Sequence, residues 1–234
     1  DSQVSFDHVR SEVFLLTKLR EAGFSVPEPI KALDGAYVSQ ISPDGSDDPG
    51  YCVMYNWIEG IMLADIPIAE RSPDLVNRLG LELAQLHTFL ETLAVPSWFT
   101  APRRDLEHLN EIIQRQRIKH APFKILRNLE NVASLFERLN EYPNAFGLTH
   151  NDLNKGNILI NGDKITFIDF THFGWGFYLN DVAKIIDFGV ARSNEEELLR
   201  GYTEIRDLPD DTAAVLRNFR VIRKPLRVLH WNWF

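Results

Sequence analysis

The stretch HNDLNKGNILINGDKITFIDF, residues 150–170, contains two short apolar runs flanked by a histidine, several asparagines and two aspartates. A third aspartate lies between the runs. The runs NILI and KITFI alternate as half-buried strands do, and the NGD between them tolerates the positive φ of a tight turn. A two-residue turn of glycine and aspartate pairs Asn161 with Lys164, and hence Asn157 with Ile168. We therefore expect a hairpin with polar side chains at its open end.

Three oxygen-bearing side chains converge on that open end. The pairing brings Asn157 close to Asp169, and Asp152 approaches from a loop that follows a predicted strand at 146–149. Hard oxygen ligands suit Mg²⁺, which usually takes one or two protein carboxylates and shares its other positions with water and substrate phosphates. Phosphoryl transfer uses such a metal and a separate carboxylate that orients the attacking hydroxyl and accepts its proton. The sequence therefore predicts a phosphoryl-transfer site.

The spacing His150-x-Asp152-x-x-x-x-Asn157, followed by the tripeptide IDF, resembles the signature of the aminoglycoside phosphotransferase and choline kinase family. This family is related to the protein kinases, whose signature has an arginine where this chain has Asn151. The resemblance implies that Asp152 is the catalytic aspartate and that His150 braces its loop. It also implies that Asn157 and Asp169 bind Mg²⁺, and that ATP is the phosphoryl donor.

The resemblance extends on both sides of the signature. Gly176 and Asp181, in GWGFYLNDVAKI, correspond to a glycine and an aspartate that hold the family's catalytic loop in shape. Glu12 is similar to the glutamate that pairs with a strand lysine at the nucleotide phosphates, and VMYNWIEG is similar to the hinge that lies along adenine. The implied nucleotide contacts are Glu12, Tyr55 as gatekeeper, the backbones of Asn56 and Ile58, and Leu159 and Ile168 beneath the base.

The chain also departs from the family pattern. It shows no glycine-rich loop, and residues 1–11 contain no lysine, so we expect the N-terminal lobe to be incomplete in this chain. Asn154 and Lys155 stand where family members often have histidine and proline. Lys155 is a candidate catalytic residue that contacts the transferring phosphate, or else a solvated loop charge. Glu12 is likewise either a nucleotide-site residue or an exposed helical glutamate.

The rest of the chain predicts an α+β, protein-kinase-like bilobal fold. Residues 1–60 are expected to form a partial nucleotide-binding lobe with one helix and the hinge, and residues 61–234 a mainly helical catalytic and acceptor-binding lobe. Strands are predicted at 36–42 and 51–58. Apolar spacing and helix-ending prolines and glycines predict helices at 5–22, from Ser72 to before Pro96, and at 105–119, 122–141, 178–192, 194–203 and 210–232.

Composition limits the function classes. The 234 residues are 44% hydrophobic and 25% charged, which is typical of a folded globular protein, and a net charge of −8 disfavours nucleic-acid or anionic-membrane partners. The single cysteine, Cys52, favours a reducing compartment, and we expect the cytoplasm. No apolar run is long enough to span a bilayer, and the first residues do not resemble a signal peptide. The sequence does not indicate an oligomeric state.

The predicted activity is Mg·ATP-dependent phosphorylation of a hydroxyl group on a small polar molecule. The resemblance suggests an aminoglycoside, a choline-like amino alcohol or a homoserine-like compound. We expect helices between 73 and 142 and at the C-terminus to line the acceptor pocket, where their acidic residues could hold an amine. Three alternatives stay open: a bacterial protein serine/threonine kinase, a non-catalytic nucleotide-binding pseudokinase, and a metal-dependent hydrolase. The hydrolase would use His150, Asp152, Asp169 and His172.

Aromatic and histidine residues allow two interpretations. Four tryptophans could box a quaternary ammonium or polyamine, although large aromatics are more often core residues; they are Trp57, Trp175, Trp231 and Trp233. His87 and His172 lack a third nitrogen or thiolate at zinc-like spacing. We therefore interpret both histidines as structural, or as supports for residues of the site.

Overall fold

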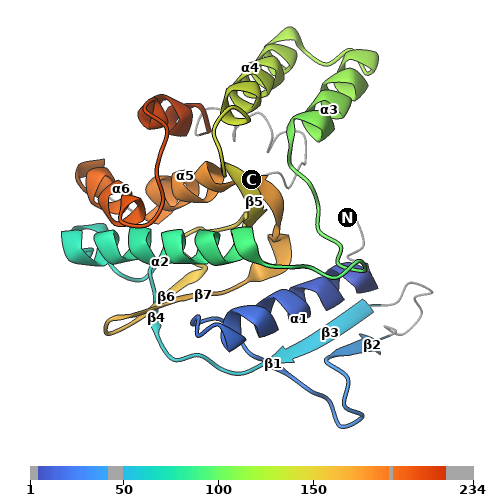
Figure 1. The fold of residues 1–234 in the computed structure, drawn as a ribbon, viewed down its shortest axis with the longest axis vertical. Helices are drawn as coiled ribbons and strands as arrows, with labels where there is room; N and C mark the ends of the chain where they lie inside the picture. The colour runs from blue at the N-terminus through green and yellow to red at the C-terminus, as the bar shows by residue number, and fades with distance from the viewer. Residues whose placement is uncertain (1–4, 42–49, 190–191, 220–234) are drawn as a thin grey trace.

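A computed structural model describes residues 5–41, 50–189 and 192–219 of the chain (Figure 1). The first described helix, α1 (Phe6–Glu21), begins at Ser5, whose hydroxyl accepts the backbone N–H of His8. It packs on an antiparallel sheet in the order β1-β3-β2, made of β1 (Pro29–Ile30), β2 (Val38–Ile41) and β3 (Gly50–Tyr55).

The predicted hairpin is confirmed. It consists of β6 (Ile158–Asn161) and β7 (Lys164–Phe167), with Asn161 opposite Lys164 as expected. A two-residue strand, β4 (Ile61–Met62), pairs with the outer edge of β6. The segment that follows β3 is thereby joined to the hairpin.

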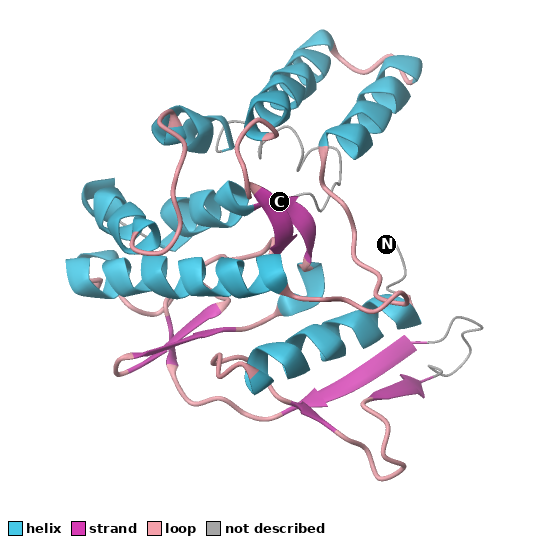
Figure 2. Cartoon of the chain, viewed as in Figure 1, coloured by secondary structure: helices cyan, strands magenta, loops and turns pink. Residues whose placement is uncertain are grey.

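Helices make up most of the remaining structure (Figure 2). The buried leucines of α2, including Leu79, Leu83, Leu86 and Leu90, lie in the central core. Ser72 accepts the backbone N–H of Leu75 and so caps the N-terminus of this helix. The α-helices are α2 (Pro73–Thr92), α3 (Leu106–Ile118), α4 (Phe123–Leu139), α5 (Tyr178–Gly189) and α6 (Glu195–Thr203), and the 3₁₀ helices are η1 (Ile68–Glu70), η2 (Phe170–His172) and η3 (Arg192–Asn194).

The helices α2 and α6 approach each other so closely that only glycine fits at two positions. A Cβ atom at Gly201 would lie 1.9 Å from the backbone oxygen of Asn77, and one at Gly80 would lie 2.0 Å from that of Leu198. Both contacts are far inside van der Waals distance. The glycines therefore set the spacing of the helix pair.

A second antiparallel pair supports the loop that carries Asp152. The strand β5 (Phe146–Thr149), which was predicted, pairs with β8 (Gly174–Phe177), which was not. The sequence GWGF is a weak strand signal because two of its four residues are glycine. The backbone N–H of Trp175 also donates to Pro102, and a Cβ at Gly174 would come within 2.6 Å of that same carbonyl oxygen.

The predicted α+β, kinase-like fold class is confirmed, and the predicted helices form with ends shifted by a few residues. Residues 212–219 are helical, and the rest of the predicted helix at 210–232 lies outside the described residues, as do Trp231 and Trp233. Among the described residues, no helix is long and apolar enough to cross a membrane.

Candidate active site

A buried carboxylate holds the loop that carries Asp152. Asp181, on α5, is fully buried and accepts the backbone N–H groups of His150 and Asn151, each at 2.9 Å. Nε2 of His87, on α2, lies 3.3 Å from the same carboxylate. These bonds fix the backbone immediately before Asp152, which is the role that the resemblance implies for Asp181.

Burial and close contacts set the protonation of this cluster. Burial alone raises the pKa of Asp181, but the hydrogen bond from His87 and the neighbouring charges lower it, so the pKa lies below its ordinary value. Complete burial lowers the pKa of His87 and of His150, and both are neutral near pH 7. Because ionised Asp181 only accepts, Nε2 of His87 carries the proton, and Nδ1 accepts the hydroxyl of Tyr202 at 2.9 Å.

His150 lies beneath the loop, fully buried. Its Nε2 donates to the carbonyl of Ile168 at 3.0 Å, and its Nδ1 accepts the backbone N–H of Asp152 at 3.2 Å. One ring therefore joins the two segments that carry Asp152 and Asp169. Asn151 and Asp169 adopt left-handed backbone conformations, with φ of 62° and 61°, which asparagine and aspartate tolerate better than most residues. Such conformations concentrate at functional sites.

The carboxylate of Asp152 is held from two sides. Its Oδ2 accepts the side-chain amides of Asn154 at 3.2 Å and Asn157 at 3.1 Å. Its Oδ1 lies 3.3 Å from Nζ of Lys184 on α5. The Asp152 side chain is nevertheless 29% exposed, so a hydroxyl group can approach an oxygen that is already oriented.

Asn157 and Asp169 offer oxygen ligands to a divalent metal. The Asn157 amide donates through Nδ2 to the backbone carbonyl of Asp152 at 2.8 Å, which leaves its Oδ1 as an acceptor. The backbone N–H of Ile168 donates to the carbonyl of Asn157 at 3.0 Å, so the next residue, Asp169, follows beside it. The Asp169 carboxylate is exposed to an adjoining cavity. An amide oxygen and a carboxylate fit the donor set of Mg²⁺.

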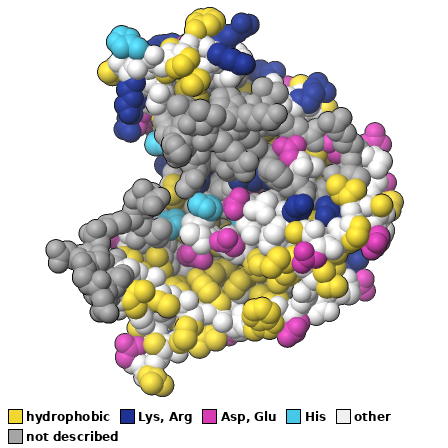
Figure 3. Space-filling view, turned by 180° about the vertical axis from the view of Figure 1, so that it is seen from behind, with side chains coloured by type: hydrophobic (Ala, Val, Ile, Leu, Met, Phe, Trp, Pro, Cys, Tyr) yellow, Lys and Arg dark blue, Asp and Glu magenta, His cyan; other side chains and the backbone are white. Residues whose placement is uncertain are grey.

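That cavity has a volume of about 580 Å³ and adjoins Asp169. Residues from α1, from the segment after β3 and from the hairpin line it together. They include every predicted nucleotide contact: Glu12, Tyr55, Asn56, Ile58, Leu159 and Ile168. In Figure 3, hydrophobic side chains gather over the lower part of the molecule. A largely apolar cavity with carboxylates at its edge suits an aromatic base whose phosphates extend toward a metal.

Glu12 is buried on α1 and accepts the hydroxyl of Tyr55 at 3.1 Å. The alternative interpretation, an exposed helical glutamate, is therefore wrong. Burial raises the pKa of Glu12 to about 7; the hydrogen bond from Tyr55 opposes this effect, and the charge of Asp169 adds to it. A nucleotide-binding role for Glu12 stays a prediction.

The backbone groups of Asn56 and Ile58, which are the predicted base contacts, differ in availability. The backbone N–H of Asn56 donates to the carbonyl of Glu28 at 3.0 Å, and its side-chain oxygen accepts the N–H of Glu28 at 2.7 Å. Only the carbonyl of Asn56 is therefore available to a base. The N–H of Ile58 has no hydrogen-bond partner among the described residues, so it remains available as a donor.

A lysine missed by the sequence analysis contacts the loop that carries Asp152. Lys184 is 2% exposed and lies three positions after Asp181, on the same face of α5. A lysine on the buried face of an apolar helix was the available signal. Lys155, by contrast, is exposed on the loop, and its candidate catalytic role stays a prediction.

The aromatic and histidine predictions separate clearly. Trp57 is 84% exposed and lines the 580 Å³ cavity, whereas Trp175 is partly buried on β8 and packs against the core. Core packing is thus confirmed for Trp175. His87 is structural, as expected, and His172 is partly exposed in η2.

Residues 2–215 match the model of the phosphotransferase enzyme family. The chain belongs to this family. It is 23% identical to amicoumacin kinase of Bacillus subtilis (strain 168) over 95% of this chain and 68% of that enzyme. A solved amicoumacin kinase in complex with AMP-PNP, Ca²⁺ and Ami superposes with a TM-score of 0.73 at 20% identity, covering 95% of this chain and 69% of the other. A microcompartment-associated aminopropanol kinase superposes with a TM-score of 0.74 at 27% identity, covering 98% and 73%.

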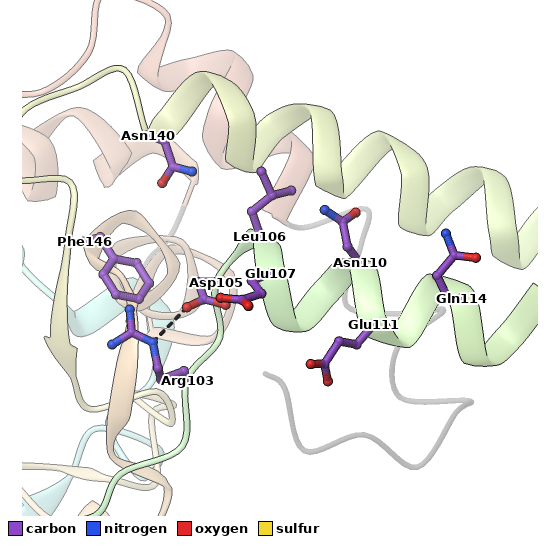
Figure 4. Close-up of a pocket in the computed structure, with 9 residues that line it drawn as sticks. All are labelled: Arg103, Asp105, Leu106, Glu107, Asn110, Glu111, Gln114, Asn140 and Phe146. Carbon is purple, nitrogen blue, oxygen red and sulfur yellow. Dashed lines mark hydrogen bonds and ion pairs between the residues drawn. The ribbon is translucent and has the colours of Figure 1, made fainter.

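A second cavity of this phosphotransferase, of about 790 Å³, lies along α3 (Figure 4). Its lining combines three carboxylates with three side-chain amides, an arginine and apolar groups: Asp105, Glu107, Glu111, Asn110, Gln114, Asn140, Arg103, Leu106 and Phe146. Arg103 forms an ion pair with Asp105 at 2.8 Å and lies 5.2 Å from the ring centroid of Phe146. Phe146, in this lining, begins the strand β5, which is followed by the loop that carries Asp152.

Proposed function

We propose that this phosphotransferase transfers the γ-phosphoryl group of ATP to a hydroxyl group of a small, amine-bearing alcohol. The observation that carries the proposal is that Asp169 lines a cavity together with all the predicted nucleotide contacts. The residue before Asp169 pairs with Asn157, whose amide binds the Asp152 carboxylate. The related kinases support it, since a solved one holds a nucleotide analogue and a divalent ion. The proposed division is a nucleotide-binding lobe at 1–60 and a catalytic, acceptor-binding lobe at 61–234.

In the proposed reaction, Asp152 orients the acceptor hydroxyl and takes its proton as the oxygen attacks the γ-phosphorus. The new O–P bond forms as the bond from the γ-phosphorus to the bridging oxygen breaks, which leaves ADP. Asn157 and Asp169 would hold Mg²⁺, which neutralises charge on the phosphates. No covalent enzyme intermediate is required.

The proposed acceptor carries an amine because the cavity along α3 presents three carboxylates and one arginine. Glu107 is exposed and forms no ion pair within the described part of the chain, so its charge is available to a ligand. We expect Glu107→Gln to raise the KM of an amine acceptor several-fold with little change in the KM of ATP. Glu137→Gln, on the exposed face of α4, is the matched control and should change neither constant.

The activity is tested with Mg·ATP and a panel of amino alcohols, aminoglycosides and homoserine. Asp152→Asn should reduce acceptor phosphorylation roughly 10²–10⁴-fold while the Kd of the nucleotide stays within about twofold. Asp163→Asn, in the exposed hairpin turn, is the control. Transfer to casein-like proteins alone would favour a protein kinase. Nucleotide binding without transfer would favour a pseudokinase, and phosphate release without any acceptor would favour a hydrolase.

The metal assignment has its own test, because Asp169 is expected to hold Mg²⁺ and not to contact the base. Asp169→Asn should weaken Mg²⁺-dependent nucleotide binding at least tenfold, measured by isothermal titration calorimetry. Binding measured in EDTA should be unchanged by the substitution. Equal losses with and without Mg²⁺ would contradict the assignment. We further expect the protein to act in the cytoplasm, without nucleic-acid or membrane partners.

A further inference from the structure

Lys184 is a buried cation whose ammonium group contacts the catalytic loop. It lies on α5 with 2% of its side chain exposed, among apolar neighbours of the same helix that are also buried, such as Val182 and Ile185. An ammonium group removed from water costs several kcal/mol unless paired charge and hydrogen bonds offset that cost. The contacts of its Nζ therefore show what this residue does.

Two of those contacts are to consecutive residues of the loop. Nζ donates to the backbone carbonyl of Asn151 and lies 3.3 Å from Oδ1 of Asp152. Asn151 has a left-handed backbone, with φ of 62°, and its N–H is held by Asp181, one helical turn before Lys184. The two side chains of α5 thus hold the N–H and the C=O of the same strained residue.

The contact with Oδ1 completes the support of the Asp152 carboxylate. Asn154 and Asn157 bind only Oδ2 and leave rotation about the last side-chain bond weakly restrained. A cation at Oδ1, fixed on a buried helix, restrains that rotation. The exposed Lys155 is only four positions from Asn151 and lies in the loop itself, yet it makes no such contact among the described residues.

We propose that Lys184 is a positioning residue that sets the orientation of the Asp152 carboxylate and the backbone conformation of Asn151. The kinetic part of this proposal rests on the proposed function, in which Asp152 orients the acceptor hydroxyl. The residue itself is too deeply buried to touch the substrate, and its effect reaches the reaction only through Asp152.

Kinetics of Lys184→Met and Lys184→Gln test the proposal. Both variants remove the charge and shorten the unbranched reach of the side chain by only one atom, and Gln also keeps a donor for the Asn151 carbonyl. We expect kcat to fall roughly 10–100-fold with the KM of ATP within twofold, because binding does not depend on the Asp152 orientation. In the Asp152→Asn background the same change should have little further effect. Lys164→Met, on the exposed strand β7, is the matched control.

A thermal double-mutant cycle separates this proposal from the proposed function, because it needs no acceptor. Lys184→Gln and Asp152→Asn are measured singly and together, and the melting temperatures should be non-additive, the double variant melting several degrees above the additive sum. If the wild type transfers no phosphate but this coupling is present, the proposed function fails and the contact with Asp152 stands. Additive melting temperatures, or a kcat unchanged in both Lys184 variants, would overturn the proposal.

Discussion

At the scale of single residues, the candidate site residues could be predicted from the sequence where their placement depends on local spacing. The turn fixes the hairpin register, which brings the segment that carries Asp169 beside Asn157, and such a register follows from sequence. The Asn157 amide in turn binds Asp152. The contact of Lys184 with Asp152 and the engaged N–H of Asn56 could not be predicted from the sequence, because each depends on a distant segment. A lysine on an apolar helix indicates burial but not the partner. Burial of Glu12 is the same kind of property.

Glu12 supplies a prediction at this scale, because its pKa is raised from 4.5 to about 7 by burial. The native state therefore holds a proton that the unfolded chain releases between these pH values, so stability falls as pH rises through this window. The loss is complete above about pH 7 and corresponds to roughly 3 kcal/mol at most. Glu12→Gln, which still accepts the Tyr55 hydroxyl, should match the wild type near pH 4 and be more stable at pH 8.

Urea denaturation at both pH values measures the effect. Glu137→Gln, an exposed carboxyl on α4, is expected to follow the wild-type pH dependence. If Glu12→Gln and the wild type lose stability in parallel from pH 4 to pH 8, the carboxyl of Glu12 does not hold the extra proton.

At the scale of elements, the long periodic helices, the hairpin and the strands β2, β3 and β5 were predicted, whereas the strands β1, β4 and β8 were not. The strands β1 and β4 have two residues each and exist because a neighbouring strand completes their hydrogen bonds. The strand β8 contains two glycines, and its strand conformation is imposed by pairing with β5. Local sequence carries little of this information, because the partner decides the conformation.

The spacing of α2 and α6 gives a prediction about elements. Gly201→Ala places a methyl group on the backbone oxygen of Asn77, so we expect a loss of about 3 kcal/mol in the free energy of unfolding. Gly23→Ala is an informative comparison, because Gly23 has φ of 91° with nothing within 4 Å of a new Cβ. There the substitution should lower the free energy of unfolding by only about 1–2 kcal/mol, because it introduces backbone strain without a steric clash. If urea denaturation shows equal losses of stability for Gly201→Ala and Gly23→Ala, then α6 can move away from α2 and relieve the clash at no further cost.

At the scale of the whole molecule, the proposed nucleotide cavity is enclosed by segments far apart in the chain. Glu12 and Tyr55 form one wall and Leu159 and Asp169 another, as expected from a kinase-like fold. Side-chain contacts join α1 to the part that carries the hairpin. His8 donates to the carbonyl of Thr171 at 2.9 Å, and Ser11 accepts the N–H of Thr100 at 2.8 Å. A ligand in this cavity would therefore stabilise both walls together.

Thermal unfolding with nucleotide tests this arrangement. At a Mg·ATP-analogue concentration of about 100 Kd, binding to the native state alone contributes about 2.7 kcal/mol. For a chain of this size, that corresponds to a rise in melting temperature of roughly 5–10 °C in a single transition. The rise should largely disappear in EDTA and in Asp169→Asn, because both remove the metal-dependent part of binding, whereas Asp163→Asn should keep it. Two separate transitions, only one of them shifted by nucleotide, would mean that the walls unfold independently and that the ligand binds to one of them alone.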